Sequence, residues 1–176
     1  MNLEDTAQAL LRLLECCNCT VSCAESCTGG LVSAAITSIP GASAVFRGGV
    51  VAYANEVKQS LLGVEPDILH EYGAVSKECA GAMAKGAKLC FGTDYAVSIT
   101  GIAGPDGGSA DKPVGTVWFG LACRGEISTF RVNFSGNRTD IRLEAAKKAL
   151  ELISALVKAS FELDNPTDGG VSFSQE

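Results

Sequence analysis

The chain has 176 residues, of which 47% are hydrophobic, and a formal net charge of -6 with a sequence pI near 4.8. This length suits one domain with a buried core, whereas the acidic balance argues against general nucleic-acid binding, which needs a basic face. The first residues lack a signal-peptide pattern and no apolar stretch is long enough to cross a bilayer, so we expect a cytoplasmic protein whose eight cysteines are mostly thiols.

Hydrophobic periodicity and turn residues divide the chain into alternating helices and strands. In chain order, the pattern predicts a helix over residues 3–17, a strand over 20–24, a helix over 29–38, a strand over 46–54, helical turns at 56–62 and 67–72, a helix over 76–91, strands over 94–100, 115–122 and 126–133, and a helix over 139–159. The last two strands form a hairpin across residues 123–125. This interleaving predicts an α/β layered domain with a mixed sheet. We expect a single domain over residues 1–163 and a mobile tail over 164–176.

The first strand leads into a motif that suits a nucleophile, Ala24-Glu25-Ser26-Cys27-Thr28-Gly29-Gly30. Ligands of open α/β sheets bind beyond the carboxyl ends of the strands, and free amides at the start of the next helix favour negative charge. Ser26 is therefore a candidate nucleophile with oxyanion donors close by, and a phosphate could use the same amides. Gly29 and Gly30 would let a ligand approach the backbone. An ordinary helix cap by Ser26 or Thr28 explains the pattern about equally well.

A serine nucleophile needs a base. His70 is the only histidine, and its place beside Glu71 in a short amphipathic segment favours a solvated or partly packed role. A lysine can serve instead if burial lowers its pKa so that it is neutral. Lys58, which follows a strand within Tyr53-Ala54-Asn55-Glu56-Val57-Lys58, and Lys112 are the plausible candidates.

Two more segments are expected at the same edge of the sheet. The run from Thr100 to Gly108 contains four glycines, which indicates a ligand loop or tight turns, and it lacks the Gly-Lys-Ser/Thr ending of a Walker A loop. In the segment from Ser135 to Arg142, Asn137 or Thr139 would cap the last helix, and Arg138 could bind a phosphate or carboxylate in a fork geometry. A surface salt bridge is the alternative, and it suits Arg142 better.

The cysteines give a weaker signal. Cys16 and Cys19 form a C-x-x-C, but a zinc ribbon usually needs a second, distant pair. Burial as small apolar side chains explains most of the cysteines better. Cys27 is the exception, because a helix start can lower the pKa of a thiol, which makes Cys27 a rival nucleophile to Ser26.

Taken together, these segments resemble the nicotinamide-nucleotide amidase family, also called the CinA C-terminal domain family, several of whose members carry the label competence/damage-inducible protein. The resemblance extends from about Leu3 to Val157. The matching blocks, in order, are Ala24 to Gly30, Tyr53 to Lys58, Tyr72-Gly73-Ala74-Val75-Ser76, Gly101 to Gly108, Lys112-Pro113-Val114-Gly115-Thr116-Val117 and Phe134-Ser135-Gly136-Asn137-Arg138. Each block is modest evidence by itself, whereas their joint order is highly specific.

The resemblance implies a three-layer α/β/α sandwich and the hydrolysis of nicotinamide mononucleotide to nicotinate mononucleotide and ammonia, as in pyridine nucleotide salvage. It implies a serine–lysine mechanism without metal or cofactor, with Ser26 as the nucleophile, Lys58 as the base and Tyr53 in the active site. The expected substrate-binding residues are Thr28, Gly29, Gly30, Thr100, Gly101, Gly104 and Arg138. Longer members carry an additional N-terminal domain linked to ADP-ribose pyrophosphatase activity, so we expect a standalone amidase without that activity.

Two other functions use the same loops. A nucleotide-binding sensor would bind the ligand without needing the pair of Ser26 and Lys58, and a phosphatase would want metal-binding carboxylates, for which Asp106 and Asp111 are thin support. The expected partners are a nucleotide substrate, no nucleic acid, no membrane, and further copies of the chain. An apolar hairpin edge such as Val117-Trp118-Phe119 could bury against such a copy.

Overall fold

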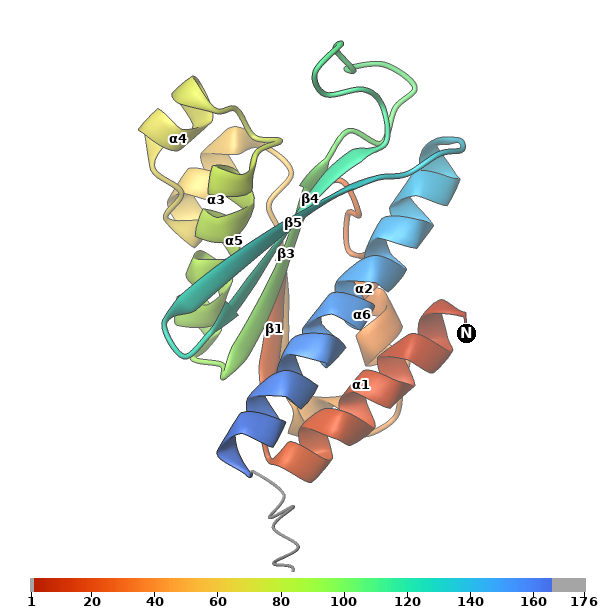
Figure 1. Ribbon diagram of the computed structural model, residues 1–176, viewed down its shortest axis with the longest axis vertical. Helices are drawn as coiled ribbons and strands as arrows, with labels where there is room; N and C mark the ends of the chain where they lie inside the picture. The colour runs from red at the N-terminus through yellow and green to blue at the C-terminus, as the bar shows by residue number, and fades with distance from the viewer. Residues whose placement is uncertain (1, 166–176) are drawn as a thin grey trace, which may run out of the picture.

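Helices and strands alternate along the chain in the computed structural model, which describes residues 2–165 (Figure 1). In order, they are α1 (Leu3–Cys17), β1 (Val21–Glu25), α2 (Leu31–Thr37), η1 (Ala42–Ala44), β2 (Phe46–Val51), α3 (Asn55–Leu62), α4 (Pro66–Glu71), α5 (Lys77–Phe91), β3 (Tyr95–Gly101), β4 (Thr116–Cys123), β5 (Glu126–Asn133) and α6 (Arg138–Asp164). Each helix and strand expected from the sequence is present, and the ends shift by only a few residues.

The five strands form one mixed sheet in the order β2-β1-β3-β4-β5. Strands β2, β1 and β3 run parallel, whereas β4 runs antiparallel to both β3 and β5. Figure 1 shows α1, α2 and α6 on one side of the sheet and α3, α4 and α5 on the other. The expectation of a three-layer α/β/α sandwich with a mixed sheet is confirmed.

The strand order creates a crevice at the carboxyl end of β1. The chain leaves β1 through α2 to reach β2, and it then returns through α3, α4 and α5 on the other face to reach β3. Ligands of open α/β sheets bind at such a switch point, outside the carboxyl ends of the strands. The ends of β1, β2 and β3 therefore meet at one edge, where the chain leaves β5 as well.

Two buried clusters hold the layers together. Apolar positions at helical spacing on α1, among them Leu10 and Leu14, and on α6, among them Leu150 and Ile153, meet the face of the sheet that carries Val97. On the other face, Met83 of α5 packs with Leu62 of α3. Gly86 on α5 allows this contact, because a Cβ there would collide with the Leu62 carbonyl. Close packing of α3 on α5 fixes the helix that carries Lys58.

The last part of the chain settles one open alternative and corrects one expected helix end. Asn137 rather than Thr139 caps α6: its side chain accepts from the amides of Thr139 and Asp140, and Asp140 completes a capping box. The helix also continues to Asp164, five residues past its expected end. Of the tail expected from residue 164, positions 166–176 lie outside the described residues.

The hairpin does not offer the apolar edge that was expected. Val117 and Phe119 are fully buried in the core, because β4 lies between β3 and β5 and both of its faces are covered. The exposed apolar side chains of the hairpin are instead Ile127 and Phe130 on the edge strand β5. Within residues 2–165, no helix combines the length and the apolar character that a membrane crossing requires.

Candidate active site

Ser26 lies directly after β1, at the edge where the parallel strands end. Its amide donates to the Ile99 carbonyl at 2.9 Å, which continues the pairing of β1 with β3 and fixes the backbone of the serine. The side chain is largely buried, with 8% of its surface exposed. It borders a cavity of about 200 Å³ at the crevice.

Lys58 reaches the same cavity from α3 and is the largest fully buried side chain, with 1% of its surface exposed. Its Nζ lies 3.2 Å from Ser26 Oγ, 2.8 Å from the Ala52 carbonyl and 3.0 Å from the Tyr53 carbonyl. No carboxylate of the described residues lies within ion-pairing distance of it. Burial therefore lowers the pKa of Lys58 from its ordinary value.

Lys58 Nζ can donate to three oxygens, those of Ala52, Tyr53 and the Ser26 hydroxyl, so its contacts fit an ammonium as well as a neutral amine. A neutral amine has two N–H donors and one lone pair, and the two carbonyls of Ala52 and Tyr53 can accept both donors. The lone pair then faces the Ser26 hydroxyl, from which it can accept a proton. This arrangement allows the buried lysine to act as a base toward the serine.

Four other expected site residues line the cavity together with Ser26 and Lys58: Tyr53, Thr100, Gly101 and Arg138. Arg138 donates to the Tyr53 hydroxyl at 3.2 Å and to the Gly104 carbonyl at 2.7 Å. Thr100 donates its hydroxyl to the Ala74 carbonyl at 2.7 Å, which ties β3 to the segment before α5. Gly104 thus holds Arg138 through its carbonyl and is not itself in the lining.

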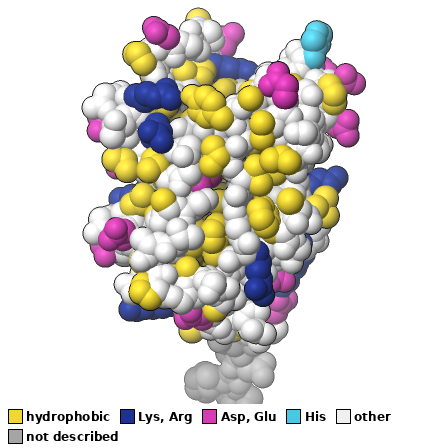
Figure 2. All heavy atoms as spheres, turned by 180° about the vertical axis from the view of Figure 1, so that it is seen from behind, with side chains coloured by type: hydrophobic (Ala, Val, Ile, Leu, Met, Phe, Trp, Pro, Cys, Tyr) yellow, Lys and Arg dark blue, Asp and Glu magenta, His cyan; other side chains and the backbone are white. Residues whose placement is uncertain are grey.

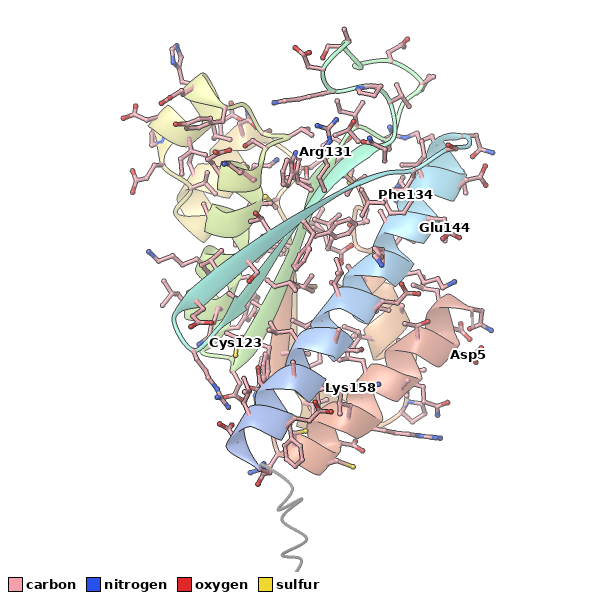
Figure 3. All side chains as sticks on the ribbon, in the orientation of Figure 1. Asp5, Cys123, Arg131, Phe134, Glu144 and Lys158 are labelled. Carbon is pink, nitrogen blue, oxygen red and sulfur yellow. The ribbon has the colours of Figure 1, made fainter. Side chains whose placement is uncertain are left out.

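The turn between β5 and α6 sets the position of Arg138. Phe134 packs edge-to-face on Phe119 of the core, with ring centroids 6.3 Å apart, and its amide donates to the Gly115 carbonyl at 2.9 Å. Figure 3 shows Phe134 beside the first turn of α6. The first residue of α6, Arg138, is thereby held at the rim of the cavity.

The start of α2 does not offer free amides to a ligand, which corrects an expectation from the sequence. Glu25, the last residue of β1, is fully buried, and its carboxylate accepts from the amides of Gly30, Val32 and Ser33 at 2.8–3.1 Å. It also accepts from the Ser33 hydroxyl at 2.8 Å. The anion site of this helix is thus occupied by a side chain of the protein itself.

Thr28, Gly29 and Gly30 do not line the cavity described above. Thr28 is fully buried, and its hydroxyl finds no hydrogen-bond partner among residues 2–165. Gly30 donates its amide to Glu25. In the structure, the cavity is therefore lined by Ser26 and Cys27 of this motif, and not by the three residues that follow them.

Two residues have contacts that the sequence did not indicate. The sequence placed Glu25 inside the Ser26 motif but gave it no role, although an acidic residue at the end of a buried strand just before a helix could have signalled a cap. Arg142 was expected in a surface salt bridge. It instead donates to the carbonyls of Cys27 and Thr28, 115 and 114 residues away along the chain.

The alternative bases and nucleophiles fit the geometry less well. His70 is exposed on α4, and Lys112 donates to the Tyr72 carbonyl at 2.9 Å; neither lines the cavity. Cys27 does line it, but burial raises the pKa of its thiol to about 12, so the reactive thiolate is scarce at neutral pH. Cys123 pairs with Tyr95 at the start of β3, so it lies at the end of the sheet away from the cavity (Figure 3).

Metal chemistry has no evident donor set in the described part of the chain. Within residues 2–165, no three His, Cys, Asp or Glu side chains gather in a way that could hold a metal ion. The cysteines described are all free thiols. Asp106 and Asp111 are exposed and are absent from the lining of the cavity.

Comparison with known sequences matches most of the chain to one family. The model of the CinA C-terminal domain matches residues 3–157. A "CinA-like protein" of Thermotoga neapolitana is 50% identical over 151 residues, which are 86% of this chain and 37% of that protein. The "Nicotinamide-nucleotide amidohydrolase PncC" of Enterobacter agglomerans is 54% identical over 132 residues, which are 74% of this chain and 80% of that protein. The chain thus spans less than two fifths of several CinA-like relatives.

Solved structures show the same fold. The competence/damage inducible protein CihA from Agrobacterium tumefaciens has a TM-score of 0.86 and 42% identity, over 89% of this chain and 96% of that one. A CinA superfamily protein from Klebsiella pneumoniae has a TM-score of 0.87 and 33% identity, over 90% of this chain and 99% of that one. On sequence and structure alike, the chain belongs to the CinA C-terminal domain family.

Proposed function

We propose that the protein hydrolyses the carboxamide of nicotinamide mononucleotide to give nicotinate mononucleotide and ammonia, in pyridine nucleotide salvage. The observation that carries this proposal is the buried Lys58 amine, 3.2 Å from the Ser26 hydroxyl at the edge of a cavity. A protein that only binds a nucleotide has no need of a buried, uncompensated lysine, because burying an amine without a counterion costs free energy. The 54% identity to a protein named nicotinamide-nucleotide amidohydrolase supports the substrate.

The proposed acylation begins with neutral Lys58 taking the proton of the Ser26 hydroxyl as Oγ attacks the carboxamide carbon. The C–O bond forms, and the electron pair of the carbonyl moves to oxygen. The oxyanion electron pair then re-forms the carbonyl, and the C–N bond breaks as the nitrogen receives a proton and ammonia leaves. Protonated Lys58 supplies this proton, either directly or by reprotonating Tyr53 after Tyr53 has delivered its own, so Lys58 ends the step neutral. The product is an ester of Ser26 with the nicotinate group.

Deacylation uses the same residues in reverse. Lys58, neutral again, takes a proton from a water molecule that attacks the ester carbon. The Ser26 alkoxide leaves and recovers the proton from Lys58, which releases the nicotinate product. One water is consumed and one ammonia is released per cycle, so the reaction needs no other reactant.

The shape of the cavity suggests which end of the substrate enters first. Ser26 and Lys58 are buried, whereas Tyr53 is 61% exposed and the neighbouring Arg138 is exposed as well. The carboxamide group of the pyridinium ring would reach the serine, and the phosphate would stay at the rim near the Arg138 guanidinium, which suits phosphate binding. Arg138 is favoured over Arg142 for this role, because Arg142 is engaged with backbone carbonyls.

The test is ammonia release from nicotinamide mononucleotide, with chelator present, together with nucleotide binding by calorimetry. We expect wild type and Cys27→Ser to release ammonia, and Ser26→Ala to bind the nucleotide without turnover. Binding without ammonia release by well-folded wild type would instead favour a nucleotide sensor. Full activity of Ser26→Ala combined with loss in Cys27→Ser would assign the nucleophile to the cysteine.

A further inference from the structure

Arg142 contacts the loop that carries the proposed nucleophile. It lies one turn after Arg138 on α6, but its Nε donates to the Cys27 carbonyl at 3.1 Å and its Nη2 to the Thr28 carbonyl at 2.8 Å. Gly29 lies close against the guanidinium, since a Cβ there would be 3.2 Å from Nη2, and its φ of +61° favours glycine. The loop backbone at Gly29 therefore packs directly against the Arg142 guanidinium, and a side chain at this position would crowd it.

Glu25 holds the other side of the same loop. Its buried carboxylate binds the amides of Gly30, Val32 and Ser33, as described above. The carbonyls of the loop thus face a cation from α6, whereas the amides that follow face an anion from β1. The Arg142 guanidinium and the Glu25 carboxylate, each through several hydrogen bonds to the backbone, thus fix the chain between Ser26 and α2.

The Arg142 contact with the Cys27 carbonyl determines where the Thr28 amide points. In a trans peptide, the C=O of one residue and the N–H of the next point in opposite directions, so holding the Cys27 carbonyl directs the Thr28 amide away from Arg142. Neither the Cys27 nor the Thr28 amide donates to an oxygen among residues 2–165. Both amides instead lie where they favour a negative charge at the Cys27 sulfur, although burial outweighs them and raises the pKa of that thiol.

We propose that Arg142, supported by Glu25, is a positioning residue that fixes the backbone following Ser26 and thereby keeps the Ser26 hydroxyl beside Lys58 Nζ for attack. Cys27, whose carbonyl Arg142 holds, follows the nucleophile directly and lines the same cavity. This inference rests on the proposed amidase function.

The kinetic test compares two arginines one turn apart on α6. We expect Arg142→Ala to lower kcat by about 100-fold, the effect of a reacting group misplaced by about 1 Å, with KM nearly unchanged and the pH profile unmoved. Arg138→Ala should mainly raise KM, and Arg12→Ala on the exposed face of α1 should change neither. Arg142→Lys should recover part of kcat, because an ammonium can bind one of the two carbonyls. If Arg142→Ala does not fold, the same comparison with wild type is made with Arg142→Lys.

A second measurement does not depend on turnover. Loss of the Arg142 contact should loosen the loop, so Cys27 should be alkylated by iodoacetamide several-fold faster in Arg142→Ala than in wild type or Arg138→Ala, as read by peptide mass spectrometry. An unchanged alkylation rate, or a rise in KM with kcat intact, would overturn the proposal. If wild type itself released no ammonia, the amidase function would fail, and the positioning role of Arg142 in catalysis would fail with it even where the alkylation rate still rose.

Discussion

A single buried lysine decides the chemistry of the site. Lys58 Nζ is held by two backbone carbonyls and faces a serine hydroxyl, and no carboxylate lies within ion-pairing distance of it in the part of the chain that the structure describes. Burial of this kind disfavours the ammonium, and a lysine is the cation whose pKa responds most readily to burial. In the proposed mechanism, Lys58 takes the place of a histidine in activating Ser26.

The pH dependence of wild type should report this lysine. Because the neutral amine is the active form, kcat/KM should rise with pH as Lys58 loses its proton. Burial lowers the pKa of Lys58, so the midpoint of the rise should lie below 10.5, the ordinary value. Initial rates of ammonia release between pH 5 and 10 measure it, with Lys58→Arg as the inactive control, since a guanidinium keeps its proton at these pH values. A rate that stays flat across this range would contradict the assignment of the base.

A substitution at Thr28, whose hydroxyl has no hydrogen-bond partner among the described residues, can distinguish a structural role of this residue from a role in substrate binding. A buried hydroxyl without a partner costs free energy, so the near-isosteric Thr28→Val should raise the free energy of unfolding by about 1 kcal/mol. The activity of this variant should stay near that of wild type, because the side chain does not line the cavity. Urea unfolding measures the predicted gain in stability, and ammonia release measures whether activity is kept. A large loss of nucleotide affinity would show instead that the Thr28 hydroxyl binds the substrate.

The sequence indicates the residues at the site better than it indicates their partners. Ser26 and Lys58 stand out because each follows a strand and because one histidine at an exposed position leaves few candidate bases. The contact of Arg142 with Cys27 spans 115 residues, and no local pattern encodes a contact of that range. The role of Glu25 depends on burial of its carboxylate, which a sequence motif does not show.

At the scale of elements, α2 begins on a carboxylate from the preceding strand rather than on its own cap. Gly30, its N-cap residue, has no side chain to accept from the first amides, and Glu25 supplies the acceptor instead. The hydrophobic periodicity that predicted the helix could not show that its acceptor is Glu25, five residues before the N-cap Gly30. Helix and strand types follow from hydrophobic spacing, whereas ends depend on such caps, as the start of α6 at Asn137 also shows.

Removal of this carboxylate should destabilise the protein. Glu25→Ala leaves the amides of Gly30, Val32 and Ser33 without this acceptor, that of Val32 fully buried, so we expect the free energy of unfolding to fall by roughly 3 kcal/mol. Glu25→Gln should lose less, because an amide oxygen can still accept. Urea denaturation measures both, with the exposed Glu56→Ala expected within about 0.5 kcal/mol of wild type. Equal stability of Glu25→Ala and Glu56→Ala would contradict the role of Glu25 in holding α2.

At the scale of the whole molecule, the sheet has two open edges, β2 and β5. Exposed apolar side chains accompany both: Val51 on β2, and Ile127 and Phe130 on β5. β5 crosses the front of the molecule in Figure 1, and the opposite face carries apolar side chains down its middle, with charged side chains mostly toward its margins (Figure 2). Open edges with exposed apolar residues favour association with another chain, and we propose a homo-oligomer that uses β5.

A charge on β5 should test this assembly. Phe130 is 42% exposed, and Phe130→Lys would place a cation in the proposed contact, so we expect light scattering to report a smaller species than for wild type. Leu89→Lys, on the exposed face of α5, is the matched control and should keep the mass of wild type. A monomeric wild type, or a mass unaffected by Phe130→Lys, would remove β5 as the interface.

In the proposed mechanism Ser26 and Lys58 act as one unit in amide hydrolysis, and a double-mutant cycle measures whether they do. Ammonia release from nicotinamide mononucleotide is measured for wild type, Ser26→Ala, Lys58→Met and the double variant. Residues that act as a unit are non-additive, so each single variant should lose nearly as much rate as the double variant. Losses that multiply, or a single variant that keeps most of the wild-type rate, would contradict the paired mechanism.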